Sequence, residues 1–331
     1  MRTTRPATWL ARETSRTPVA KYDVLTMGRV SVDLYPEQIG VPLAKVSKFS
    51  KSLGGSATNV AVAASRLGRH AAVITKVGAD GFGEYVREAM GSFGVDAEFV
   101  GTDARLRTPL VFCEIYPPDN FPLLFYREPT APDMTLTVAE LPRDAIREAG
   151  LFWTTGTGLS AEPSRAATLA AIELATGTRV HDLDHRPSLW RDGDEPRRWA
   201  MKAAERATVV VGNLDEVEMA TGMRDPANAA AALLAAGPEI VIVKQGLAGA
   251  SAFTKERTFH AEAIPVTVVC GLGAGDAFGG ALAHGLLAGW DLGRTLTFAN
   301  AAGAIVASRL ACADAMPTPF EVNDLLATSK R

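Results

Sequence analysis

Three glycines and one aspartate are grouped in the run 271–278 (GLGAGDAF), where a loop turns into an alanine-rich helical segment. Glycines let backbone N–H groups approach an anion without interference from Cβ atoms, and the N-terminus of the following helix adds partial positive charge. The motif therefore predicts a phosphate site at Gly273, Ala274 and Gly275. Asp276 falls in the first turn and is our candidate general base for an attacking hydroxyl. Close helix packing with Asp276 as a helix cap would produce the same pattern.

Two earlier segments could complete a ligand site. The run 53–59 (LGGSATN) places Gly54 and Gly55 immediately before a helical stretch and ends with Asn59. The run 28–33 (GRVSVD) ends an expected strand with Asp33, at the position where open α/β sheets bind ligands, and this carboxylate could hold two hydroxyls. An ordinary helix start and a solvated strand end are the alternative interpretations. The joint occurrence of these segments with the glycine-aspartate motif favours a binding site.

The elements that must position these residues alternate along the chain. Short apolar or β-branched runs alternate with alanine-rich helical segments, which predicts an α/β fold with a parallel sheet and crossover helices. The expected strands are 24–30, 72–77, 151–155, 179–183, 209–212 and 240–244. The expected helices include 57–67, 83–93, 165–175, 227–236, 274–288 and 292–308.

One stretch breaks this alternation. The extended runs 108–116 and 121–127 are joined by Pro117-Pro118-Asp119-Asn120, which predicts a β-hairpin. Together with residues 36–51 the hairpin could form a small sheet outside the main domain. Such a sheet would serve as a lid, because phosphoryl transfer to a sugar must exclude water. We expect lid segments at about 35–52 and 106–130 within a single domain that spans 21–331.

The composition excludes several classes of function. The 331 residues are 47% hydrophobic and 21% charged, and the formal net charge is −3. A chain without a basic stripe is not expected to bind nucleic acid. The three cysteines, Cys113, Cys270 and Cys312, lie far apart without a C-x-x-C pair, so no disulfide framework or zinc site is expected and a cytoplasmic location fits best. The apolar segment 274–290 is too short for a membrane span. The arginine-rich residues 1–20 are expected to form a mobile tail.

Three motifs in this order and spacing resemble the ribokinase-like (PfkB) carbohydrate kinases: Gly54-Gly55 with Asn59, the run 213–216 (NLDE), and the run 273–276 (GAGD). The resemblance extends from about Tyr22 to the C-terminus. It implies a Rossmann-like three-layer α/β/α domain with a small β-sheet lid. It also implies ATP as phosphoryl donor, Mg²⁺, and a sugar hydroxyl as acceptor.

The resemblance assigns roles to individual residues. It implies that Asp276 is the base and that the amides around 273–275 bind the transferred phosphate. Asn213 and Glu216 would organise Mg²⁺ through water, because this ion gives up its hydration reluctantly. Asp33, Gly54, Gly55 and Asn59 would hold the sugar. We further expect ATP to lie along Lys244, Gly246 and the helix of Asn300, with an apolar adenine pocket formed by residues 298–304.

The segments 27–36, 112–119, 182–187 and 312–317 resemble one member of this family that phosphorylates a keto sugar acid on a primary hydroxyl. An acidic substrate calls for guanidinium groups, and Arg127 and Arg186 are placed for that role. Ordinary surface salt bridges are the alternative for either arginine. Kinases of 2-keto-3-deoxygluconate, and then of ribose or fructose, are the alternative substrate classes.

One departure from the family pattern concerns the stretch before the glycine-aspartate motif. Many family members have Asp-Thr-Thr where this chain has Cys270-Gly271-Leu272, so activation by a monovalent cation such as potassium is doubtful. Cys270 could be sensitive to oxidation, although an inert buried thiol is favoured.

The run 156–161 (GTGLSA) imitates a dinucleotide fingerprint, but no acidic residue follows at the required distance, which disfavours an NAD-dependent dehydrogenase. A homodimer through the lid is possible.

Overall fold

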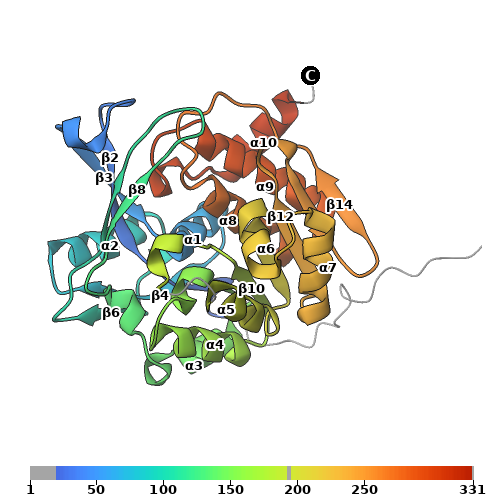
Figure 1. Ribbon diagram of the computed structural model, residues 1–331, viewed down its shortest axis with the longest axis horizontal. Coiled ribbons are helices and arrows are strands. Elements are labelled where there is room, and N and C mark those ends of the chain that lie inside the picture. The colour runs from blue at the N-terminus through green and yellow to red at the C-terminus, as the bar shows by residue number, and fades with distance from the viewer. Residues whose placement is uncertain (1–19, 192–194, 330–331) are drawn as a thin grey trace, which may run out of the picture.

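The computed structural model describes residues 20–191 and 195–329, so the expected tail 1–20 lies outside the described residues except for Ala20. Its centre is a ten-stranded, mostly parallel sheet in the order β14-β13-β12-β11-β10-β9-β1-β4-β5, with β6 paired to β4 (Figure 1). The strands are β1 (Val24–Met27), β4 (Ala71–Gly78), β5 (Val95–Asp96), β6 (Val100–Asp103), β9 (Leu151–Thr155), β10 (Thr178–Asp182), β11 (Val209–Asn213), β12 (Ile240–Lys244), β13 (Ala250–Phe253) and β14 (Thr258–Ala261). Only the pairs β12–β13 and β13–β14 are antiparallel within this sheet.

Helices cover both faces of the sheet, as the apolar character of its strands requires. In β9, Trp153 packs into the core beneath α1 (Ser56–Arg66), α8 (Ala274–Leu287) and α9 (Leu292–Ala307), whereas its neighbour Phe152 packs into the core on the opposite face. The remaining helices are α2 (Gly81–Ser92), α3 (Arg143–Glu148), α4 (Ser164–Leu174), α5 (Glu195–Ala204), α6 (Leu214–Thr221), α7 (Pro226–Ala236) and α10 (Pro319–Thr328). The predicted α/β class and its three layers are confirmed.

A second sheet of four strands, in the order β3-β2-β7-β8, stands beside the main domain (Figure 1, upper left). Its strands are β2 (Ser31–Pro36), β3 (Phe49–Gly54), β7 (Leu110–Cys113) and β8 (Leu123–Tyr126). The antiparallel pairing of β7 with β8 confirms the predicted hairpin. We call these four strands the small sheet.

The prediction of one strand over 24–30 is wrong. The strand in the main sheet ends at Met27, and the chain then crosses to the small sheet, where β2 begins at Ser31. Asp33 is therefore not at the end of a main-sheet strand, as predicted, but inside β2, opposite Ser52 and Val111. The continuous apolar pattern concealed this break, because buried strands of both sheets have similar composition.

None of the helices in the described parts of the chain combines the length and the apolar character that a membrane span requires.

Candidate active site

Asp276 lies where two helices begin. It is in the first turn of α8, and its carboxylate accepts hydrogen bonds from Ser56 Oγ (2.9 Å) and Asn59 Nδ2 (2.8 Å), both in the first turn of α1. The N-termini of two helices thus meet at one carboxylate, and their partial positive charges favour an anion there. Sequence reasoning brought Asp276 and Asn59 together but missed Ser56.

Burial is the main influence on this carboxyl group and raises the pKa of Asp276 above its ordinary value. The hydrogen bonds from Asn59 and Ser56, together with the positive charge of Arg29, oppose that shift. A carboxylate that is desolvated but held by two donors is a stronger base than a solvated one and keeps a fixed orientation. The group is suited to accept a proton from a hydroxyl bound beside it.

The loop before α8, residues 271–273, and the first residues of the helix have the shape of an anion site, and we call residues 271–275 the anion loop. Gly273 is the N-cap residue and has φ +83°, a left-handed conformation that favours glycine, and a Cβ atom there would lie 2.8 Å from Cys312 Sγ. The N–H groups of the first turn of a helix have no partner within the helix, so Gly275 and Asp276 have donors available for an anion. A Cβ atom on Gly275 would lie 3.5 Å from Lys244 Nζ, which brings a cation to the same place.

Lys244 ends β12 and lies within a group of acidic side chains. Its Nζ is 3.8 Å from Asp182 Oδ2 at the end of the neighbouring strand β10. Burial lowers the pKa of Lys244, but the charges of Asp182, Glu216 and Asp276 outweigh that effect and raise it. Burial raises the pKa of Asp182 to about 7, while Lys244 acts in the opposite direction. The expected nucleotide residue Lys244 is thus a charged lysine beside the anion loop.

Asn213 and Glu216 form a capping box at the start of α6. The Asn213 side chain accepts from the Glu216 N–H (2.9 Å), and Glu216 Oε2 accepts from the Asn213 N–H (2.7 Å). These bonds hold a buried carboxylate near Asp182, and carboxylate oxygens are the donors that Mg²⁺ prefers. No group of three metal-binding side chains is preformed among the described residues. The Asn213 and Glu216 oxygens are a donor set that an ion keeping most of its water could use, so the contact of Mg²⁺ through water stays a prediction.

The small sheet contributes Asp33 on its buried face. Asp33 Oδ1 accepts a hydrogen bond of 2.7 Å from Ser31 Oγ, and burial raises the pKa of Asp33 to about 6. A Cβ atom on Gly54 would lie 2.1 Å from Asp33 Oδ1, so glycine at position 54 makes room for this carboxylate. Asn59 Oδ1 is buried without a hydrogen-bond partner among the described residues and is free to accept from a ligand hydroxyl. Gly55 is the N-cap residue of α1.

The two arginines predicted to bind an acidic substrate are both paired with carboxylates. Arg127 follows β8 and donates to Asp133 across 2.7 Å, and both side chains are buried. Arg186 is 2.9 Å from Asp184, which is also buried. The Arg127 pair is therefore not the surface salt bridge of the alternative interpretation, whereas the Arg186 side chain is 35% exposed and that alternative stays open for it. One nitrogen of each guanidinium, Arg127 Nη1 and Arg186 Nε, is buried without a hydrogen-bond partner in the described chain.

The other predicted nucleotide residues lie along α9 and the loop after β12. Gly246 begins a 3₁₀ turn with φ +58° and has open space around it. Asn300 Nδ2 donates to the carbonyl groups of Ala261 (2.9 Å) and Glu262 (3.0 Å), so Asn300 holds the chain that leaves β14.

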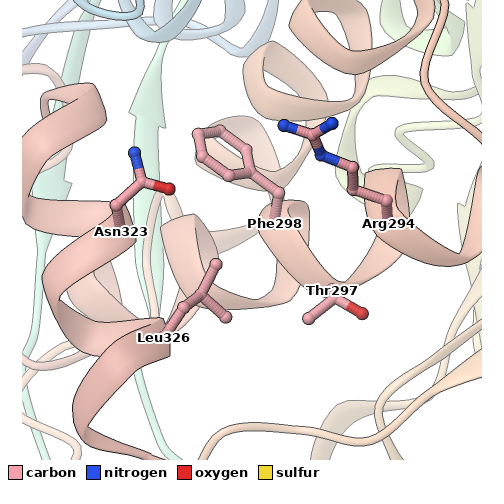
Figure 2. Close-up of a pocket in the computed structure, with 5 residues that line it drawn as sticks. All are labelled: Arg294, Thr297, Phe298, Asn323 and Leu326. Atoms are coloured by element: carbon pink, nitrogen blue, oxygen red, sulfur yellow. The ribbon is translucent and has the colours of Figure 1, made fainter.

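Phe298 begins the region 298–304 that is expected to contribute an apolar adenine pocket, and its side chain lies on the α10 side of α9. This ring is stacked on His284, with centroids 5.8 Å apart, and it faces a groove of about 400 Å³ between α9 and α10. Figure 2 shows that groove, which is lined by Arg294, Thr297, Phe298, Asn323 and Leu326. Residues two apart in a helix point about 200° apart, so Phe298 and Asn300 cannot face the same pocket.

The three cysteines, although distant in sequence, gather with Tyr35 in one buried cluster behind the anion loop. They are free thiols, and Tyr35 Oη is 2.8 Å from Cys312 Sγ. Burial raises the pKa of Cys270, which favours the inert thiol over the oxidation-sensitive one. Sequence reasoning missed this cluster because nothing in the spacing of the cysteines reveals it.

Comparisons with known proteins agree with this geometry. The pfkB family carbohydrate kinase model matches residues 21–319. A protein of Listeria monocytogenes serotype 4a named 5-dehydro-2-deoxygluconokinase is 35% identical over 317 residues, which cover 94% of this chain and 97% of the relative. A protein of the same name from Bacillus licheniformis is 31% identical over 314 residues, with 93% and 96% covered.

Solved structures of sugar kinases have the same fold. An E. coli protein provisionally named ribokinase II, crystallised with ATP and Mg²⁺, superposes with a TM-score of 0.85 at 25% identity and covers 92% of this chain and 99% of its own. Aminoimidazole riboside kinase from Salmonella enterica, complexed with aminoimidazole riboside and an ATP analogue, gives a TM-score of 0.77 at 29% identity, with 92% and 99% covered. Nothing in these comparisons supports a dehydrogenase. With the family matched along nearly its whole length, this chain belongs to the pfkB family of carbohydrate kinases.

Proposed function

We propose that this carbohydrate kinase transfers the γ-phosphate of ATP to the 6-hydroxyl of 5-dehydro-2-deoxy-D-gluconate, a reaction of myo-inositol breakdown. The observation that carries the kinase chemistry is Asp276 held by Ser56 and Asn59 beside the glycine loop. The substrate is supported by the names of the relatives that are 31–35% identical over nearly the whole chain. The nitrogens of Arg127 and Arg186 that are buried without a partner in the described chain suit a substrate with a carboxylate.

In the proposed reaction the acceptor lies between Asp33 and Asp276 with its primary hydroxyl facing Asp276. Asp276 accepts the hydroxyl proton, and the oxygen forms a bond to the γ-phosphorus as the bond from that phosphorus to the bridging oxygen breaks, releasing ADP. The free N–H groups of Gly275 and Asp276 and the ammonium of Lys244 stabilise the charge that develops on the transferred group.

Asn213 and Glu216 would hold Mg²⁺ through its bound waters, and the ion would neutralise charge on the nucleotide phosphates. Gly246 and Asn300 would border the nucleotide, with Asn300 acting by fixing the chain at Ala261 and Glu262. The small sheet would cover the acceptor as a lid and exclude water.

A substrate panel tests the proposal. ADP formation is measured with 5-dehydro-2-deoxygluconate, 2-keto-3-deoxygluconate, gluconate, ribose and fructose, and the position of the new phosphate is read by phosphorus NMR. We expect the highest kcat/KM for 5-dehydro-2-deoxygluconate and a 6-phosphate product. A higher kcat/KM for 2-keto-3-deoxygluconate would assign the runner-up substrate, and a preference for ribose or fructose would overturn the sugar-acid assignment.

A homodimer through the lid is also proposed. The outer face of the small sheet carries Leu124 and Tyr126, whose side chains are 47% and 59% exposed. Phe112 lies between Phe49 and Tyr126 with ring centroids 5.3 Å from each. Such an apolar face favours a second copy of the sheet. Sedimentation of the parent and of Tyr126→Lys tests this, and a monomeric parent would contradict it.

A further inference from the structure

We propose that Arg29 binds the carboxylate of the sugar acid and sets the preference for acidic over neutral sugars, an inference that rests on the proposed function. Arg29 lies between β1 and β2, where the chain crosses from the main sheet to the small sheet. It is 7% exposed. Neither the relatives' names nor the motifs that carry the family resemblance give this residue a role.

Arg29 lies against the start of α1, the segment proposed to hold the sugar, because a Cβ atom on Gly55 would lie 2.3 Å from the Arg29 carbonyl oxygen. Its Nε is 3.8 Å from Asp184 Oδ2, and its Cζ is 5.8 Å from the ring centroid of Phe125 on β8. Burial raises the pKa of Asp33 and of Asp276, and the charge of Arg29 opposes both shifts. The guanidinium thus lies between Asp184 and the Phe125 ring, and its charge acts on both proposed site carboxylates.

Arg29 also has unused hydrogen-bonding capacity. Its Nε is buried and has no hydrogen-bond partner among the described residues, and the 3.8 Å approach to Asp184 is too long for a hydrogen bond. Arg127 and Arg186 also have one buried nitrogen each without a partner in the described part of the chain, but a carboxylate within 3 Å already holds each of these two guanidinium groups: Arg127 donates to Asp133 (2.7 Å) and Arg186 is 2.9 Å from Asp184. An unsatisfied buried donor costs roughly 1–3 kcal/mol, and more when it is charged, so a ligand acceptor is expected at Arg29.

A carboxylate is the acceptor that suits this place. Asp33, Asp184 and Asp276 form an acidic surrounding that would repel an acidic substrate unless a cation faced it. A guanidinium with a free edge can bind a carboxylate through two parallel N–H bonds, which a lysine at the same place cannot do. Phe125 shields this contact on the side of the small sheet and lowers competition from water.

A simpler role for Arg29 would be to balance the charge of the three aspartates. That role predicts that removing Arg29 changes turnover of every substrate by the same factor, because the pKa of Asp276 matters for each of them. Carboxylate binding predicts a change only in the ratio between acidic and neutral substrates. The readout is therefore the ratio of kcat/KM for 5-dehydro-2-deoxygluconate to that for its neutral analogue, in which the carboxylate is reduced to a hydroxymethyl group.

In Arg29→Gln this ratio is expected to fall about 30-fold, the effect of losing one charged hydrogen-bonded pair. Titration with ATP, monitored by intrinsic fluorescence, checks that the variant is folded. Should Arg29→Gln not fold, Arg29→Lys gives the same test with an expected fall of about tenfold, because it keeps the charge but not the fork. Arg165→Gln is the matched control: Arg165 is likewise buried, at 9% exposed, but its Nε is already satisfied by Leu159 O (2.7 Å), and its loss should leave the ratio at the parent value.

The outcomes separate the two proposals. A parent that does not prefer the sugar acid contradicts the proposed substrate and the role of Arg29 together. A parent that prefers the acid, with a variant that keeps the parent's ratio, contradicts the role of Arg29 alone. A selective loss in Arg29→Gln with an unchanged Arg165→Gln supports the inference.

Discussion

Asn59 in α1 and Asp276 in α8 are joined by a hydrogen bond of 2.8 Å from Nδ2 to Oδ2, although 217 residues separate them. The bond connects the segment proposed to hold the sugar with the proposed base. It therefore links acceptor binding to the orientation of the catalytic carboxylate, and the first two predictions follow from it.

Asp276→Asn removes the proton acceptor but keeps the size of the side chain. We expect kcat to fall about 10³-fold while the Kd for ATP stays near the parent value, because the anion loop is unchanged. Steady-state kinetics and a nucleotide titration check this. Asp291→Asn, at the N-cap of α9, is the matched control and should keep parent turnover. An Asp276→Asn enzyme with most of its turnover would contradict the assignment of the base.

Asn59→Ala removes a donor that favours the ionised form of Asp276. The pKa of Asp276, already raised by burial, should rise further, and the base must be ionised to act. The acid limb of kcat at saturating sugar therefore moves to higher pH, by roughly one unit for one hydrogen bond to a charged group. Asn323→Ala, on the exposed side of α10, should leave the pH profile unchanged. An unmoved acid limb in Asn59→Ala would show that this bond does not tune the base.

Asp33→Asn should make the protein more stable near neutral pH. Burial raises the pKa of Asp33 from 3.8 to about 6 in the folded protein. The folded state therefore binds the proton more tightly, and the stability that this gives is complete below pH 3.8 and is lost as the pH rises through about 6. At pH 8 the ionised group lowers the free energy of unfolding by as much as about 3 kcal/mol.

Thermal unfolding of Asp33→Asn and the parent at pH 5 and pH 8 checks this prediction. The variant should gain stability at both pH values, and the gain at pH 5 should be about half of the gain at pH 8, because Asp33 is largely ionised in the unfolded state at pH 5 but still largely protonated in the folded state. An equal gain at both pH values would indicate that charge at Asp33 is not the cause. The same variant should bind the sugar more weakly, since Asp33 is proposed to hold it.

Potassium should not activate this enzyme. Cys270 stands in the stretch where many family members have an aspartate that helps hold a monovalent cation, and here the side chain is packed in an apolar cluster. Turnover measured with potassium chloride or with choline chloride at equal ionic strength should differ by less than about twofold. A much larger activation by potassium would show that backbone oxygens alone suffice for such a site.

Local patterns allowed several elements to be predicted closely. The predicted bounds of β9 and β12 and the predicted start of α8 at Ala274 agree with the structure. Each is determined locally, the strands by short apolar runs and the helix start by the glycines that precede it. The position of Asp33 was not predictable in this way. Both sheets use buried β-branched strands, so the sequence does not show where the chain leaves one sheet for the other.

The site was predictable only in part. Asp276 and Asn59 each carry a local motif, and the structure brings them together. The environment of Arg29 could not be predicted from neighbouring residues in the sequence. Its neighbours Asp184 and Phe125 come from distant segments, the loop after β10 and strand β8. The partner of Arg127, Asp133, is only six residues away. The two residues are joined by a loop and not by a regular helix, so their spacing in the sequence did not indicate that they pair.

The hairpin of the small sheet contacts the anion loop directly, because a Cβ atom on Gly271 would lie 3.0 Å from the ring of Phe121. Displacing the hairpin to admit an acceptor would therefore also uncover the loop that is proposed to receive the nucleotide's terminal phosphate. The two substrates should consequently influence each other's affinity, and sugar occupancy should slow the release of nucleotide.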